Sequence, residues 1–104
     1  ASYEYIVRAL TKFGLLHIFG DRISCVEMVT HGKPSPDVFI HAAGRLGLAT
    51  SDCVVIEDSE NGIAAAKATR MKAIRLMADG SDERADVTIK ELGQLLSIGI
   101  LAEA

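Results

Sequence analysis

The sequence has no block of lysine and arginine, no tryptophan and no long run of apolar residues. Without a basic patch interleaved with aromatic side chains, we do not expect nucleic acid as a partner. Because no apolar run approaches about 18 residues, no membrane-spanning segment is predicted. The net charge is −3, and the first residues do not resemble a signal peptide, so we expect a cytoplasmic protein.

Cysteine is scarce as well, since Cys25 and Cys53 are the only two. Each lies among apolar residues, and neither has the CxxC or histidine spacing of a zinc site. We therefore expect two structural thiols rather than a disulfide or a metal centre.

The sequence does supply enough apolar residues for a core, with 49% hydrophobic residues in a chain of 104, which suits one small domain. Periodicity and turn residues predict helices over residues 3–16, 35–47, 63–68 and 90–101, and strands over 23–29, 53–56, 73–77 and 85–89. This alternation is typical of parallel strands joined by right-handed crossovers. The predicted fold is α/β, a Rossmann-like parallel sheet with flanking helices. With only about four strands, it looks like one side of such a sheet.

The most informative segment, residues 53–62, reads Cys-Val-Val-Ile-Glu-Asp-Ser-Glu-Asn-Gly. Four apolar residues without alternation are typical of a strand buried on both faces. Ligands of α/β sheets bind beyond the carboxyl ends of strands, where Glu57 and Asp58 fall. Two neighbouring carboxylates with no basic residue beside them suit a hard cation such as Mg²⁺. Acidic decoration of a helix N-terminus is the simpler alternative.

A second segment, residues 32–39, reads Gly-Lys-Pro-Ser-Pro-Asp-Val-Phe. Lys33 lies between Gly32 and Pro34, and a following proline keeps a residue out of the helical region, so Lys33 is expected to be extended. Its loop and the acidic loop should open on the same edge of the sheet. There an ammonium group, two carboxylates and a metal could converge on a phosphate.

Together the two segments closely resemble the haloacid dehalogenase-like hydrolases, in the branch of phosphatases and β-phosphoglucomutases. The resemblance implies a Rossmann-like core, Mg²⁺ as cofactor, and a small phosphorylated metabolite as substrate. It also implies an aspartate nucleophile that becomes an aspartyl-phosphate.

The resemblance assigns roles by position. Lys33 matches the catalytic lysine that binds the phosphoryl group. Asp58 matches the acidic metal ligand, and Glu57 the acid beside it, which we expect to act through water because successive strand side chains point to opposite faces. Ser59 and Asn61 match the turn that opens the next helix and are candidate phosphate or substrate contacts. Ser59 also fits a helix cap.

The departures from the family pattern matter as much. No Asp-x-Asp pair follows a hydrophobic strand, so the nucleophile is not in this sequence. We therefore expect residues 1–104 to be the C-terminal portion of one core domain, with the nucleophile segment and the cap domain in a missing N-terminal part of the same protein. Ser2 could take the phosphate-binding serine or threonine position, although a helix cap is the simpler role.

Two alternatives remain at this point. One is a metal-free haloacid dehalogenase of the same superfamily, against which the Glu57–Asp58 pair argues. The other is a non-enzymatic binding module on a doubly wound sheet, such as a receiver. Receivers carry their acid pair early and their lysine late, whereas here Lys33 precedes the acids.

Overall fold

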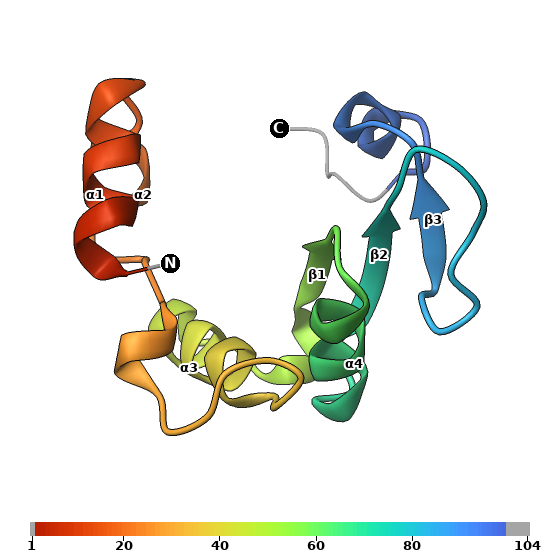
Figure 1. Cartoon of the computed structure of the whole chain (residues 1–104), viewed down its shortest axis with the longest axis horizontal. Coiled ribbons are helices and arrows are strands. Elements are labelled where there is room, and N and C mark those ends of the chain that lie inside the picture. The colour runs from red at the N-terminus through yellow and green to blue at the C-terminus, as the bar shows by residue number, and fades with distance from the viewer. Residues whose placement is uncertain (1, 100–104) are drawn as a thin grey trace.

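The computed structural model describes residues 2–99, which form helices and one sheet (Figure 1). The helices are α1 (Tyr3–Lys12), α2 (Leu16–Phe19), α3 (Asp37–Leu46) and α4 (Glu60–Ala68), and the strands are β1 (Val54–Glu57), β2 (Lys72–Leu76) and β3 (Val87–Ile89). Three 3₁₀ turns complete the order: η1 (Val26–Met28), η2 (Thr50–Asp52) and η3 (Leu92–Leu96). In Figure 1, α1 and α2 lie side by side at one end of the molecule and the strands lie at the other.

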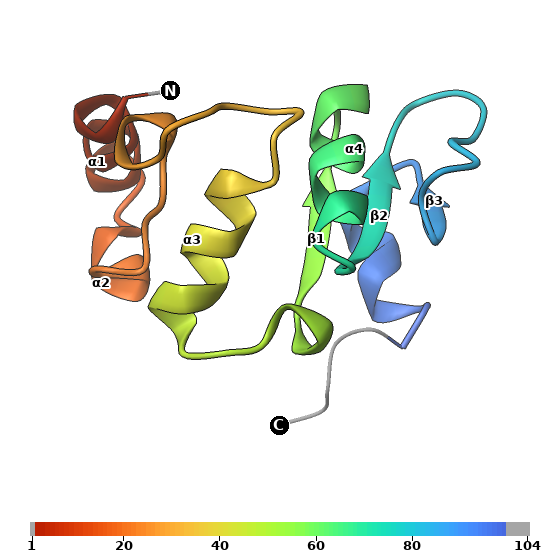
Figure 2. The ribbon, with the colours of Figure 1, turned by 90° about the horizontal axis from the view of Figure 1, so that it is seen from below.

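The sheet is fully parallel, with its strands in the order β1-β2-β3. Glu57 pairs with Arg75 at the carboxyl end of β1, and Leu76 pairs with Ile89. Helix α4 joins β1 to β2 and packs against both strands (Figures 1 and 2). The predicted α/β fold with a Rossmann-like parallel sheet and flanking helices is therefore confirmed.

The core is divided between the two faces of the sheet. On the α4 face, Ile63 and Ala66 of α4 pack with Val55, Ala73 and other buried apolar residues, and the small side chains of α4 let the helix approach closely. On the opposite face, Ile74 and Ile89 pack with Leu95 of η3. Burying each of the larger side chains, such as Val55, Ile63, Ile74 and Ile89, contributes about 1.5–3 kcal/mol, so both faces of the sheet stabilise the fold.

The expectation that β1 is buried on both faces is wrong for the part of the chain that the structure describes. Val55 is 7% exposed, but Val54 and Ile56 are each 42% exposed. The reason is that α4 covers one face of β1, whereas η3 packs under β2 and β3 on the other. The strand also begins one residue later than predicted, at Val54, and ends at Glu57.

Two other predicted elements are also wrong. Residues 23–29 form no strand; Ile23 and Cys25 are buried, and the chain turns through η1. A β-rich segment becomes a strand only beside another strand, and no described strand lies next to this one. The closing helix expected over 90–101 is only η3 within the described residues, with Leu92 and Leu96 exposed, and residues 100–101 lie outside them.

Smaller differences concern boundaries and single residues. The first predicted helix is broken at Gly14, whose φ is +69°, and continues as α2. The strand expected over 85–89 is shortened to β3. Both cysteines are free thiols, Cys25 buried and Cys53 half-buried. No helix among residues 2–99 has the length and apolar character needed to cross a bilayer.

Candidate active site at the carboxyl end of β1

Lys33 and Glu57 meet at the carboxyl end of β1, although they are 24 residues apart in sequence. The Lys33 Nζ donates a hydrogen bond to Glu57 Oε2 at 2.6 Å. The lysine side chain is 37% exposed and the glutamate side chain 10%. The predicted convergence of the two loops is confirmed for these two groups.

The loop that carries Lys33 is held from the side of α3. The backbone N–H of His31 donates to Asp37 Oδ2 at 3.1 Å, and the His31 ring lies 3.4 Å from the same oxygen. The Lys33 Nζ lies 5.0 Å from the centre of the Phe39 ring, within the range of a cation–π contact. The first turn of α3 therefore fixes both the loop backbone and the ammonium group.

Glu57 is held by three donors. Besides Lys33, the Ser59 hydroxyl and the Asp58 backbone N–H each donate to Glu57 Oε1 at 3.1 Å. Burial of the Glu57 side chain raises its pKa, but the hydrogen bond and positive charge of Lys33, aided by Asp58 and Ser59, outweigh burial. The net pKa of Glu57 is therefore lower than usual, and the ionised pair is favoured.

Asp58 is exposed and differs from Glu57 in having its carboxylate uncommitted. Among residues 2–99, its side chain forms no ion pair and no hydrogen bond shorter than 3.5 Å, although it lies close enough to Glu57 to help lower the pKa of that carboxyl. It lines a cavity of about 330 Å³ at the carboxyl edge of the sheet, together with Glu57 and apolar residues, namely Ile56, Leu76 and Leu92. An oxygen donor is thus available where ligands of parallel sheets bind.

The donor chemistry of this edge fits Mg²⁺, which is commonly held in proteins by one or two carboxylates together with waters and substrate phosphates. Asp58 offers a free carboxylate, and Glu57 offers one that is already engaged by Lys33. Within the described part of the chain, no three acidic, histidine or cysteine side chains form a complete metal cluster.

The remaining predicted residues lie at helix starts. The Ser59 Oγ accepts the backbone N–H of Gly62 at 3.0 Å and caps α4, and the Ser2 Oγ accepts that of Tyr5 at 3.1 Å and caps α1. Asn61 is exposed in the first turn of α4. Both capping roles are confirmed. Substrate or phosphate contacts by Ser59, Asn61 and Ser2 stay predictions.

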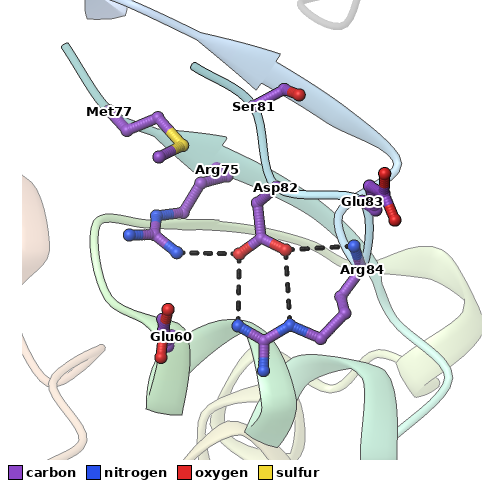
Figure 3. Close-up of a pocket in the computed structure, with 7 residues that line it drawn as sticks. All are labelled: Glu60, Arg75, Met77, Ser81, Asp82, Glu83 and Arg84. Carbon is purple, nitrogen blue, oxygen red and sulfur yellow. Dashed lines mark hydrogen bonds and ion pairs between the residues drawn. The ribbon is translucent and has the colours of Figure 1, made fainter. Parts of the chain in front are cut away.

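Sequence reasoning missed a charge cluster beside this site (Figure 3). Asp82, in the loop between β2 and β3, accepts from Arg75 at 2.7 Å and from Arg84 Nε at 3.3 Å. The Arg84 side chain, with its backbone N–H and Arg75, lowers the pKa of Asp82 despite some burial. These residues line a cavity of about 370 Å³, with Glu60, Met77, Ser81 and Glu83. The short Asp-x-Arg spacing was the available signal.

Comparison with known proteins identifies a family and several relatives that this chain resembles. The sequence family described as haloacid dehalogenase-like hydrolase matches residues 1–69. Hexitol phosphatase B of Escherichia coli (strain K12) is 36% identical over 99 residues, covering 90% of this chain and 44% of the relative. β-Phosphoglucomutase of Bacillus subtilis (strain 168) is 38% identical over 82 residues, covering 77% of this chain and 36% of the relative.

A solved structure extends the likeness to the fold. The haloacid dehalogenase-like protein of Agrobacterium tumefaciens matches with a TM-score of 0.82 and 28% identity, over 94% of this chain and 50% of that one. The chain spans about half of that structure and less than half of the length of the two curated relatives. On the sequence match over residues 1–69 and the shared fold, the chain belongs to the haloacid dehalogenase-like hydrolases.

Proposed function

We propose that this chain is the C-terminal portion of the core domain of a Mg²⁺-dependent phosphatase or phosphomutase that acts on a small phosphorylated metabolite. The observation that carries the proposal is the Lys33–Glu57 pair at 2.6 Å, beside the uncommitted Asp58 at the carboxyl end of β1. The names of the two curated relatives, a phosphatase and a phosphomutase, support the reaction class. The nucleophilic aspartate, which would carry the phosphoryl group as an aspartyl-phosphate, and the cap domain belong to another part of the same protein.

In this proposal Lys33 binds the transferring phosphoryl group. Phosphoryl transfer spreads negative charge over the equatorial oxygens, and a preorganised positive charge stabilises that state more than the ground state. Glu57 aims the Lys33 ammonium through the hydrogen bond between them, and the lowered pKa of Glu57 keeps its carboxylate ionised. Phe39 limits the directions that the ammonium can take.

Asp58 would hold Mg²⁺, with Glu57 contributing through water. When bound, Mg²⁺ neutralises negative charge on the phosphate oxygens. Ser59 and Asn61 are proposed to contact the phosphate or substrate from the start of α4, where backbone N–H groups favour anions. Since Ser59 is committed to the cap and to Glu57, Asn61 is the more available of the two.

The test uses the full-length protein that contains this segment and an aryl phosphate as substrate. Asp58→Asn should raise the Mg²⁺ concentration needed for half-maximal turnover by at least about tenfold, because even changing a group that only hydrogen-bonds to a metal ligand costs about 10–100-fold in metal affinity. Asp52→Asn is the matched control, because Asp52 is exposed at the opposite end of β1. It should leave the Mg²⁺ requirement unchanged.

Two outcomes would contradict the proposal. If Asp58→Asn turns over normally at limiting Mg²⁺, Asp58 is not a metal ligand. If the wild-type protein cleaves a haloacid without any cation and shows no phosphatase activity, the metal-free dehalogenase assignment replaces ours.

A further inference from the structure

Gly62 lies against the Glu57 side chain with no room for a side chain of its own. It is the third residue of α4 and is buried. A Cβ placed on Gly62 would overlap the Cγ and Cδ atoms of the Glu57 side chain. Because Gly62 lies within a helix and has no positive φ, glycine serves here for space and not for backbone conformation, and a larger residue would fit only if the Glu57 side chain moved.

The choice of glycine here works against the helix itself. Glycine is less favourable than alanine inside a helix, and α4 carries three consecutive alanines directly after Ile63. Gly44 of α3 provides the contrast, since a Cβ there would meet nothing within 4 Å. An alanine would therefore stabilise the helix at position 44, whereas at position 62 it would displace Glu57.

The displaced group is the one that holds Lys33. The Glu57 carboxylate accepts from Lys33 Nζ and from the Ser59 hydroxyl, and Ser59 in turn accepts the Gly62 backbone N–H. These contacts form a closed chain from the end of β1 through the helix cap to the first turn of α4. A shift of the carboxylate by the width of a methyl group would change its geometry toward Lys33.

We infer that Gly62 is a positioning residue. Because Gly62 has no side chain, the Glu57 side chain can pack against the first turn of α4, and in that position its carboxylate orients the Lys33 ammonium. The structural half of this inference stands on packing alone. Its consequence for turnover rests on the proposed function, so the two halves need separate measurements.

The structural half is tested by a double-mutant cycle in the full-length protein, read as melting temperature. Gly62→Ala and Gly44→Ala are each made with Glu57 present and with Glu57→Ala. Gly44→Ala should raise the melting temperature by a few degrees in both backgrounds, as expected for a helix interior. Gly62→Ala should lower it when Glu57 is present and raise it in the Glu57→Ala background, where the clashing atoms are gone.

The outcomes of the cycle separate clearly. If Gly62→Ala alone does not fold but folds in the Glu57→Ala background, the inference is supported. If Gly62→Ala has the same effect on melting temperature in both backgrounds, the steric relation to Glu57 is wrong.

The functional half is read as turnover of an aryl phosphate at saturating Mg²⁺. Gly62→Ala should lower kcat by about 10- to 100-fold with a smaller change in KM, because displacements of about 1 Å at a catalytic group are enough for such losses. Gly44→Ala should leave kcat unchanged. A Gly62→Ala protein with a lowered melting temperature but normal kcat would show that Gly62 is structural only. If the wild-type protein shows no phosphatase activity, the proposed function fails while the melting cycle still decides the packing claim.

Discussion

Two lysine–carboxylate pairs in this molecule have similar distances and exposures but lie at opposite ends of the strands. Lys33 and Glu57 are 2.6 Å apart, and Lys67 and Asp86 are 2.9 Å apart. The two lysine side chains are 37% and 38% exposed. Glu57 ends β1, whereas Asp86 precedes β3 and also accepts the backbone N–H of Ala73 near the start of β2 at 2.8 Å.

The comparison shows that neither distance nor exposure distinguishes the proposed catalytic lysine from the other one. The Lys67–Asp86 pair joins the end of α4 to the amino ends of two strands. The Asp86 carboxylate accepts hydrogen bonds from both Lys67 and the Ala73 backbone N–H, so it is already engaged. The Lys33–Glu57 pair lies at the carboxyl edge, beside a second carboxylate with no described partner for its side chain. An exposed pair such as Lys67–Asp86 adds only about 0.2–1 kcal/mol to stability, and it is the position at the carboxyl ends of the strands that marks the Lys33–Glu57 pair as a candidate site.

The largest expected effect comes from the 104-residue chain taken alone. The Lys67–Asp86 pair is complete within it, whereas the site around Lys33 would lack its nucleophile. β1 would also keep an unpaired edge, which invites association with other chains. We expect this polypeptide to be neither a stable monomer nor an active phosphatase. Light scattering and an aryl-phosphate assay with Mg²⁺ check this; a monodisperse monomer with many turnovers would refute our domain assignment.

The next effect separates the two lysines in the full-length protein. Lys33→Ala should lower kcat by about 10²–10³-fold, the loss typical of removing one preorganised charge stabiliser. Lys67→Ala should leave kcat unchanged. Lys33→Ala should also cost about 1–3 kcal/mol of unfolding free energy, because Glu57 is left nearly buried without its cation. Steady-state kinetics and urea unfolding measure both; equal kinetic losses in the two variants would remove the distinction drawn here.

The smallest effect concerns the Lys67–Asp86 pair. The hydrogen bond from Lys67, together with the Ala73 N–H, lowers the pKa of Asp86 despite some burial. A carboxyl whose folded pKa lies below its unfolded value stabilises the fold above about pH 4 and loses that contribution as the pH falls through the folded pKa. Asp86→Asn should therefore cost about 0.5–1 kcal/mol at pH 7 and less at pH 3.

Urea unfolding at both pH values measures this difference. Asp79→Asn is the control, since Asp79 is exposed and forms no ion pair with any residue among 2–99. It should change stability little at either pH. A cost of Asp86→Asn that is larger at pH 3 than at pH 7 would contradict the sign.

The sequence predicted the parallel sheet and the meeting of the two loops because both follow from local patterns. Glycine and proline around Lys33 fix a loop, and an apolar run before Glu57 fixes a strand end. The prediction of a strand over residues 23–29 was wrong because β-forming residues need a neighbouring strand, which the sequence pattern alone does not reveal. That Lys33 pairs with Glu57 rather than with Asp58, and that Glu57 packs against Gly62, are features of three-dimensional packing that the spacing of residues does not reveal.

The charge cluster in Figure 3 also bears on which cation pairs with Glu57. Glu57 and Arg75 are partners in the parallel register, so their side chains leave the same face of adjacent strands. Asp82 engages the Arg75 guanidinium at 2.7 Å, and Lys33 is the one cationic partner of Glu57 among residues 2–99. Because Asp82, in the loop between β2 and β3, binds the Arg75 guanidinium, Glu57 pairs with Lys33 and not with the arginine on the neighbouring strand.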